Sequence, residues 1–455
     1  MSVQAPDRPL PGRPDHRRAA PAGESGLPRL LPPTASMATA EPRQLTNFAE
    51  HVRRHGLPRF RGAALIAQAG AAGLTGRGGA AFPTARKLAA VAAGGRPAVM
   101  VGNAAEGEPA SSKDAALLWF APHLVLDGLQ IAAEAVGARQ VYLYLPAHRD
   151  QAGPDLAGHL TDALASRAAA GTDRAAVDLV EAPPRFLAGE ETAVVAAING
   201  RAARPGNHGR RVFERGVAGR PTLVQNVETL AHLAVIARHG AGWFRGVGTS
   251  DEPGSALCTV RDPDGDVRVV ETAIGTPLDR LVWLGDDVQA VLAGGYHGGW
   301  LATDIARQLS LSNADLRPAG SMLGAGVLVA LPAAYCGLAE SAHVARFLAL
   351  ESAGQCGPCF NGLPAIATAL AAVARPRPAR AELANLRRWA GLVTGRGGCH
   401  HPDGTIRFVA TALEVFAGEL AEHDRGRCTA TKRDRFLPVP AAAGPAAAAT
   451  ETGWR

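Results

Sequence analysis

The sequence is poor in the features that mark secreted and membrane proteins. It has six cysteines in 455 residues, too few and too scattered for a secreted disulfide framework. No apolar run approaches the roughly 18 residues of a membrane span, and the start lacks the apolar region of a secretory signal. We therefore expect a cytoplasmic protein with no direct membrane span, whose thiols are free to bind metal or to do redox chemistry.

Lysine is also scarce. Only Lys87, Lys113 and Lys432 occur among 47 lysines and arginines. An ammonium is a compact point charge and guanidinium is a wide planar fork, so a tight pocket can require the first. Arg13, Arg17, Arg18 and other residues near the two chain ends supply much of the formal charge of +6, and no basic helix suggests a groove binder, so no nucleic-acid partner is expected.

Composition divides the chain into five parts. The Pro- and Arg-rich residues 1–45 predict a disordered leader, and 426–455 predict a flexible tail. Residues 46–250 predict a Rossmann-like α/β domain, residues 251–335 a β-grasp module, and residues 336–425 a helical bundle. The overall fold class is α/β.

The first domain shows the alternation of a parallel sheet with covering helices. Apolar runs at 97–102, 140–146 and 176–183 predict strands, and 124–138 predicts a helix between the first two. In the second domain, runs at 256–260 and 267–271 flank a turn, a short helix is predicted at 277–285, and apolar runs follow at 290–295 and 324–332.

A glycine-rich loop precedes a predicted helix in "GLTGRGGAAFPTARK", residues 73–87. Glycines lack Cβ, so the amides of Gly76, Gly78 and Gly79 can close around a phosphate or a flat ring. Arg77, Phe82 and Lys87 add charge and an aromatic face. The pattern is neither the dinucleotide fingerprint nor the Walker motif, and an ordinary mobile turn is the alternative.

Three further segments carry polar side chains in groups, the first of them directly after a predicted strand, where open α/β sheets bind ligands. Solvated loop charges are the alternative reading. The residues are Asn103, Glu106, Glu108, Lys113 and Asp114, then Gly189, Glu190 and Glu191, then Gln225, Asn226 and Thr229.

Two cysteines lie three apart in "ESAGQCGPCFNGL", residues 351–363, and a third lies in "GRGGCHHPDG". Cys356, Cys359 and Cys399 are the candidate metal ligands. A lone C-x-x-C is a weak signal, and merely buried cysteines are the alternative.

Several motifs in this order resemble the flavoprotein subunit of respiratory NADH dehydrogenase, known as NuoF or the 51 kDa subunit of complex I, from about Gly73 to Phe416. The carriers are "GRGGAAFPTARK" at 76–87, "NAAEGEPA" at 103–110, "GEETA" at 189–193, "QNVET" at 225–229 and "ESAGQCGPC" at 351–359. The resemblance implies an FMN and NADH site, a β-grasp domain of the SLBB type and a helical domain with a [4Fe–4S] cluster.

The resemblance also implies roles for residues. NADH would give hydride to FMN, and electrons would leave singly through the cluster; no side chain need act as nucleophile or general base. Phe82, Glu108 and Glu191 would face the dinucleotide. The FMN would be lined by Gly76, Arg77, Gly78, Gly79, Lys87, Asn103, Glu106, Gly189, Glu190, Gln225, Asn226 and Thr229.

The sequence departs from the family near the flavin and at the cluster. Ala105 replaces an aspartate and Phe186 a tyrosine, each removing a hydrogen bond worth about 0.5–1.5 kcal/mol, so FMN binding is expected to survive. Ala353 replaces the first cluster cysteine.

The cluster therefore has three readings. A [4Fe–4S] cluster with one unusual ligand is favoured, a [3Fe–4S] cluster comes second, and a structural zinc held by three cysteines and His400 comes third. The candidates for a fourth cluster ligand are Ser352, His400, His401 and Cys336.

The remaining expectations concern substrate and partners. His208 and Arg211 replace family residues near the dinucleotide, and with Arg210 they suggest tolerance of NADPH as well as NADH. Expected partners are a thioredoxin-like [2Fe–2S] protein or a ferredoxin, which would place the protein in the cytoplasm, free or peripheral to a membrane complex. The alternative function is a scaffold subunit with a structural zinc or a partial cluster.

Overall fold

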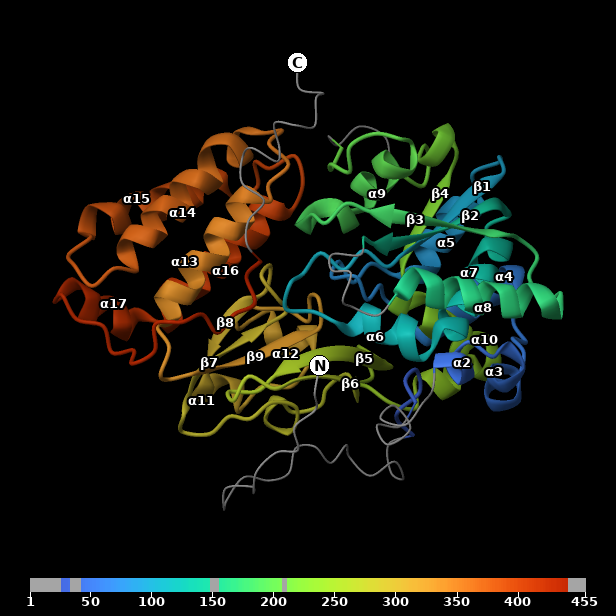
Figure 1. The fold of residues 1–455 in the computed structure, drawn as a ribbon, viewed down its shortest axis with the longest axis horizontal. Helices are drawn as coiled ribbons and strands as arrows, with labels where there is room; N and C mark the ends of the chain where they lie inside the picture. The colour runs from blue at the N-terminus through green and yellow to red at the C-terminus, as the bar shows by residue number, and fades with distance from the viewer. Residues whose placement is uncertain (1–25, 33–41, 148–154, 207–210, 441–455) are drawn as a thin grey trace.

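The structure, a computed structural model, describes residues 26–32, 42–147, 155–206 and 211–440. In the view of Figure 1, an α/β part lies on the right, a bundle of helices on the left, and a second sheet below and between them. The fold class predicted from the sequence is confirmed.

The α/β part is built on a sheet of four parallel strands in the order β3-β2-β1-β4. Met100 packs into one core, whereas Val99 and Val101 pack into another, so the side chains of β1 alternate between two covered faces of the sheet. The strands are β1 (Ala98–Asn103), β2 (Ala138–Pro146), β3 (Val177–Ala182) and β4 (Thr222–Asn226).

Helices cover this sheet, and the closest pair is α7 with α10. A Cβ on Gly128 of α7 would lie 2.0 Å from the carbonyl oxygen of Leu230 on α10, so only glycine permits this approach. The helices of this part are α2 (Pro42–Leu45), α3 (Phe48–His55), α4 (Gly62–Ala72), α5 (Thr84–Ala92), α6 (Lys113–Phe120), α7 (Pro122–Ala135), α8 (Leu156–Ala170), α9 (Glu191–Ile198) and α10 (Val227–Phe244).

The second sheet has five strands in the order β6-β5-β9-β7-β8. The strands β5 and β9, which come first and last along the chain, pair in parallel. The antiparallel hairpin of β5 and β6 lies on one side, and the antiparallel hairpin of β7 and β8 lies on the other, where β7 pairs with β9. This is the arrangement expected of a β-grasp module; its assignment to the SLBB type stays a prediction. The strands are β5 (Ser255–Arg261), β6 (Val267–Ala273), β7 (Val288–Ala293), β8 (Gly299–Ala302) and β9 (Val327–Pro332), and two short helices are α11 (Thr303–Ala306) and α12 (Asn313–Leu316).

The helix predicted at 277–285 is wrong. The structure has only a 3-10 turn over Leu278–Arg280 there. Leu278, Leu281 and Val282 are all buried in the core of the sheet, so burial of this apolar run, rather than helix formation, explains the pattern.

The helical part packs directly on the second sheet, since Trp300 of β8 and Phe408 of α16 share one hydrophobic core. A π-helical turn over Pro358–Gly362 follows Cys356 and leads into α14. The helices are α13 (Gly337–Leu350), α14 (Leu363–Val373), α15 (Arg380–Val393), α16 (His401–Val415) and α17 (Ala417–Asp424).

Two segments predicted to be loose are packed. Leu30 and Leu31, assigned above to the disordered leader, are buried, and the amides of residues 29–31 donate to Glu271. Phe436 and Leu437, assigned to the flexible tail, are also buried. The rest of the predicted leader up to residue 25, residues 33–41, and the tail beyond residue 440 lie outside the described residues, and the domain boundaries stay a prediction.

Among the described residues, no single helix has the length and apolar character needed to cross a membrane. The pair α6 and α7 has a suitable composition but bends by 96° between the two helices, and α7 is buried along most of its length.

Candidate functional site

The candidate nucleotide site lies at the carboxyl ends of β1 and β4. Asn103 and Asn226 are opposed there as the last residues of the two strands. Because β1 connects to β2 on one side and pairs with β4 on the other, the strand order reverses between them. Open α/β sheets bind their ligands at such a reversal.

The glycine-rich loop lies against this edge. The Arg77 amide donates to Thr229 Oγ1 at 2.9 Å, and a Cβ on Gly78 would lie 3.2 Å from that of Asn226. Gly79 has a φ of +103°, which favours glycine. The loop is therefore fixed in one conformation against the start of α10.

The segment after β1 packs closely on the segment before α9. Asn103 Nδ2 donates to the Gly189 carbonyl at 2.8 Å, and a Cβ on Gly107 would lie 2.2 Å from the Phe186 carbonyl oxygen. The ring of Phe186 packs edge-on against His297 at 4.8 Å. These contacts bring the predicted segment that follows β1 together with the predicted segment around Gly189.

Two of the predicted carboxylates hold helix N-termini. Glu106 accepts from the amides of Asp114 and Ala115, both at 3.3 Å, at the start of α6. Glu190 accepts from the amides of Thr192 at 2.9 Å and Ala193 at 3.1 Å, at the start of α9. Both groups thus fix the positions of the loops around the strand ends.

The residues predicted to face the dinucleotide lie partly exposed. Lys87 pairs with Glu191 at 3.0 Å, and the ring of Phe82 is 49% exposed, with the Arg86 guanidinium 5.7 Å from its centre. An exposed aromatic ring beside cationic groups can receive a flat, anionic ligand.

Glu108 connects the α/β part to the second sheet. It accepts from the amides of Tyr296 at 2.7 Å and Ala110 at 3.2 Å. Burial raises the pKa of Glu108 to about 7, although both amides favour its ionised form. The group therefore titrates near neutral pH.

A buried cluster of charges contacts the site through Asn226. The sequence indicated Lys113 and Asp114 but not Glu228. Lys113 pairs with Asp114 at 2.7 Å and with Glu228 at 2.9 Å, while Asn226 donates to Asp114 at 2.7 Å. Burial opposes ionisation of Glu228, yet Lys113 lowers its pKa to about 2. Glu228 stands in the "QNVET" motif. The scarcity of lysine drew attention to Lys113, but no sequence signal joined it to Glu228.

The described residues fit a phosphate-bearing flavin. The side-chain atoms Nε2 of Gln225 and Nε of Arg77 are buried and have no hydrogen-bond partner within the described part of the chain. Buried donors normally have partners. Unpaired donors on residues of the glycine-rich loop and of β4 suit a ligand rich in acceptor atoms.

The three predicted metal-binding cysteines come together in the helical part. Cys356 Sγ lies 3.4 Å from Cys359 Sγ. Burial opposes ionisation, but the amides of Gly398 and Cys359 hold the pKa of Cys356 below its usual range. Burial raises the pKa of Cys399 to about 11, and the charges of Cys359 and Glu190 add to the rise. Glu190 therefore lies within electrostatic range of the thiols.

Two candidates for the fourth cluster ligand are wrong. His401 is buried, with Nε2 2.8 Å from the Leu348 carbonyl and Nδ1 2.9 Å from His297 Nε2, so neither nitrogen is free. Cys336 lies 3.7 Å from His423 Nε2 in a different group. Ser352 and His400 remain, while Ala353 presents a buried methyl group.

A zinc ion bound by Cys356, Cys359 and Cys399 is disfavoured by spacing. Among the described residues, the one group of three or more ligand atoms within 4.8 Å of one another involves other cysteines. A single tetrahedral ion needs ligand atoms about 3.3–3.8 Å apart. Cys356 and Cys359, at 3.4 Å, meet this spacing, but Cys399 does not join them in such a group.

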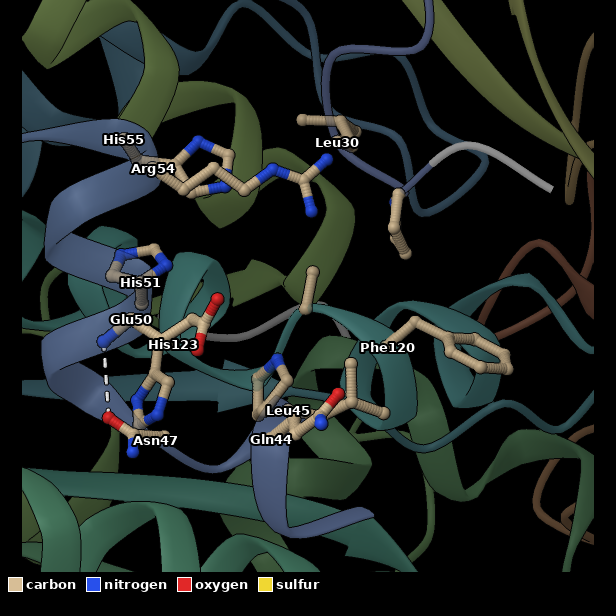
Figure 2. Close-up of a pocket in the computed structure, with 13 residues that line it drawn as sticks. Leu30, Gln44, Leu45, Asn47, Glu50, His51, Arg54, His55, Phe120 and His123 are labelled. Atoms are coloured by element: carbon tan, nitrogen blue, oxygen red, sulfur yellow. Dashed lines mark hydrogen bonds between the residues drawn. The ribbon is translucent and has the colours of Figure 1, made fainter. Parts of the chain in front are cut away.

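A cavity of about 330 Å³ lies elsewhere, between the N-terminal helices and the junction of α6 and α7. Figure 2 shows His51 and His123 on two of the segments that line it. None of the predicted nucleotide-site residues lines this cavity.

The residues predicted to allow use of NADPH are only partly described. His208 and Arg210 lie outside the described residues, and Arg211 is exposed.

Two family models match the chain. The Nuo51 FMN-binding domain matches residues 69–235, and the iron-sulfur binding region of NADH-ubiquinone oxidoreductase F matches residues 339–423. The first range holds all the predicted nucleotide-site residues, and the second holds the three cysteines.

Curated relatives match over most of their length. The chain is 30% identical to the F 2 subunit of the NADH-quinone oxidoreductase of Rhizobium meliloti over 372 residues, which is 78% of this chain and 87% of that protein. It is also 30% identical to the F subunit of the NADH-quinone oxidoreductase of Streptomyces coelicolor, over 80% of this chain and 83% of that protein.

Solved structures agree. The chain resembles an NAD⁺-reducing [NiFe]-hydrogenase in its air-oxidised state, with a TM-score of 0.75 and 26% identity over 92% of this chain and 69% of that chain. For the H₂-reduced state the TM-score is 0.72 at 28% identity, over 80% of this chain and 63% of that chain, so this match leaves over a third of the hydrogenase chain uncovered. The protein belongs to the family of NADH dehydrogenase flavoprotein subunits, which includes the F subunits of the NADH-quinone oxidoreductases.

Proposed function

We propose that the strand ends of β1 and β4 hold FMN, and that electrons pass from there to a [4Fe–4S] cluster at the cysteine loops and on to a partner redox protein. The chain is an FMN-dependent NADH oxidoreductase by family. The observation that carries the site is the convergence of Asn103, Asn226 and the glycine-rich loop at one edge of the sheet.

The residues that would hold FMN fall into two groups. The amides of Gly78 and Gly79 would receive its phosphate, with Arg77 supplying charge behind them. The Gly76 amide already donates to the Phe82 carbonyl at 2.9 Å, so Gly76 would line the site without offering that donor. The second group would bind the ring and its side chain through donors at the strand ends and through residues that border them. Its members are Lys87, Asn103, Glu106, Gly189, Glu190, Gln225, Asn226 and Thr229.

The nicotinamide nucleotide would lie on the outer side of the flavin, against Phe82, Glu108 and Glu191. Phe82 would stack on a ring of the dinucleotide. Lys87, which pairs with Glu191, would also contact the nicotinamide nucleotide. We further propose that Arg210 and Arg211 allow NADPH to be used, which rate measurements with both nucleotides would test.

FMN, when bound, accepts two electrons from NADH and releases them one at a time. The chain's own contribution is to position the two cofactors. Glu190 caps α9 and its charge acts on Cys399, so the loop before α9 would connect residues that hold the flavin with residues that hold the cluster.

The cluster would be held by Cys356, Cys359 and Cys399, with Ser352 or His400 as the fourth ligand. The electron acceptor would be a thioredoxin-like [2Fe–2S] protein or a ferredoxin. The relatives named above are subunits of larger enzymes, so we propose that this chain also works within a complex, in the cytoplasm or on a membrane assembly.

An absorption spectrum of protein purified without oxygen tests this function. We expect the bands of oxidised flavin above a broad iron–sulfur shoulder, and both should bleach on addition of NADH. A colourless protein that stays colourless after incubation with FMN, iron and sulfide would contradict the proposal and support the scaffold alternative.

A further inference from the structure

A second group of ligand atoms lies in the helical part, apart from Cys356, Cys359 and Cys399. It consists of Cys336, Glu419, His423 and Cys428, whose ligand atoms all lie within 4.8 Å of one another. Cys336 precedes α13, Glu419 and His423 are one turn apart on the same face of α17, and Cys428 follows that helix. Three separate places in the chain thus converge on one point.

The spacing of these atoms suits one tetrahedral ion. Cys336 Sγ lies 3.7 Å from His423 Nε2, and His423 Nε2 lies 2.9 Å from Glu419 Oε1. Bond lengths of about 2.0–2.3 Å to zinc place tetrahedral ligand atoms about 3.3–3.8 Å apart. The first of these two separations lies within that range, and the second, a hydrogen-bond distance, would lengthen as an ion entered between the atoms.

Neighbouring groups orient three of the four ligands. His423 Nδ1 lies 3.3 Å from the Val373 carbonyl, the Thr429 amide donates to Glu419 Oε1 at 3.0 Å, and the Ala339 amide donates to Cys336 Sγ at 3.4 Å. A histidine that donates Nδ1–H to a carbonyl directs the lone pair of Nε2 into the site, as metal-bound histidines commonly do.

The imidazole of His423 faces two acceptor atoms, and either a second proton or a bound metal ion would satisfy both contacts. Nδ1 faces a carbonyl oxygen and Nε2 faces a carboxylate oxygen, both of which are acceptors. A neutral imidazole has one N–H and can satisfy only one of them. With an ion bound at Nε2, the imidazole keeps its donor for Val373, and Glu419 binds the ion instead.

We propose that Cys336, Glu419, His423 and Cys428 bind a structural Zn²⁺. Two thiolates, one imidazole and one carboxylate make a donor set of the type zinc accepts in closed tetrahedral sites. His423 and Cys336 are buried, while Cys428 and Glu419 are partly exposed, which gives the ion a route of entry.

The ion would fasten the C-terminal segment to the bundle. After Cys428, the amides of Thr431 and Lys432 donate to the Ala334 carbonyl, beside Cys336. Further on, the amides of Phe436 and Leu437 donate to Glu340. Zinc would therefore connect the start of α13, the helix α17 and the segment that lies back across them.

Metal analysis and zinc X-ray absorption of the full chain test the proposal. We expect one zinc per chain, with two sulfur neighbours at ~2.3 Å and two nitrogen or oxygen neighbours at ~2.0–2.2 Å. This measurement needs no variant. Three sulfur neighbours would place the zinc at Cys356, Cys359 and Cys399 and overturn the proposal, as would the absence of stoichiometric zinc after incubation with Zn²⁺.

Variants give a second, independent readout. Cys336→Ser and His423→Ala should each lose the zinc while keeping the iron, and Cys356→Ser should do the reverse. Cys258→Ala is the matched control, since this buried cysteine belongs to neither group; it should keep both metals. Circular dichroism identifies the folded variants, and a folded Cys336→Ser protein that retains full zinc would overturn the proposal.

Discussion

The two sides of the candidate site are built differently. On the nucleotide side the polar residues form ion pairs and hydrogen bonds with one another. Lys113, for example, pairs with both Asp114 and Glu228. On the thiol side only Cys356 and Cys359 are in contact, and a buried methyl group stands at the position where the family has a cysteine.

This difference has a physical reason. Opposite charges and hydrogen-bonding groups attract one another, so a fold can arrange them without a ligand. Thiolates repel one another, and a cluster supplies the attraction that holds them. The nucleotide side therefore depends mainly on protein contacts, whereas the thiol side depends on its metal, and the variants below separate the two.

The largest expected effect comes from removing a cluster ligand. Cys399→Ser should lose most of the iron and lower electron transfer to one-electron acceptor proteins on the order of 100-fold or more, since even supporting residues around metals contribute about 10–100-fold. Iron analysis and steady-state rates measure both. Cys428→Ser is the matched control in the same helical part and should keep its iron; a Cys399→Ser protein with wild-type iron would refute the ligand assignment.

The next largest effect comes from removing the buried cation on the nucleotide side. Lys113→Met leaves Asp114 and Glu228 buried without their cation, so the free energy of unfolding should fall by about 3–5 kcal/mol. Urea denaturation of the variant measures this. Lys432→Met, at an exposed lysine, should change the same quantity by no more than about 0.5 kcal/mol. Equal stability of the two variants would show that the buried cluster does not support the site.

A smaller effect depends on pH. The pKa of Glu108 is raised from 4.5 to about 7 in the folded protein, so its stabilising contribution is complete below pH 4.5 and is lost as the pH rises through 7. At about 1.4 kcal/mol per pKa unit, the wild type should lose about 3 kcal/mol relative to Glu108→Gln across this interval.

Urea denaturation at several pH values measures that difference. Glu414→Gln, at an exposed glutamate of α16, should follow the wild type at every pH. A constant difference between the wild type and Glu108→Gln would show that Glu108 does not titrate in this range.

Sequence patterns predicted β1, β2 and β3 of the parallel sheet because these strands are short apolar runs, and the run at 97–102 is buried on both faces. The strand β4 (Thr222–Asn226) was not predicted. They failed at 277–285, where the apolar residues reflect burial in a turn. The motifs identified most of the residues at the strand ends, although their cofactor roles stay a prediction. Local sequence could not reveal Glu228 as the partner of Lys113, because 115 positions separate two side chains that only the fold brings to 2.9 Å.

The same limit applies to the second thiol group. Cys336 and Cys428 lie far apart in sequence, with neither in a C-x-x-C pattern, so spacing gave no signal. Cys336 was instead considered for the cluster. The helical packing of α13 and α17 places it beside His423, which is information that no single motif contains.

The smallest effect sharpens the comparison by completing the thiol side. Ala353→Cys should supply a fourth thiolate in place of a weaker or neutral ligand, and the added negative charge should lower the cluster's reduction potential on the order of 100 mV, because replacing thiolates by neutral imidazoles raises potentials. A redox titration followed by electron paramagnetic resonance measures the shift, with Ala353→Ser as the matched control. If the wild type holds four irons per chain and Ala353→Cys changes neither iron content, spectrum nor potential, then the cluster lacks no ligand. The two sides of the site would then differ only in how far the fold arranges each one before its cofactor binds.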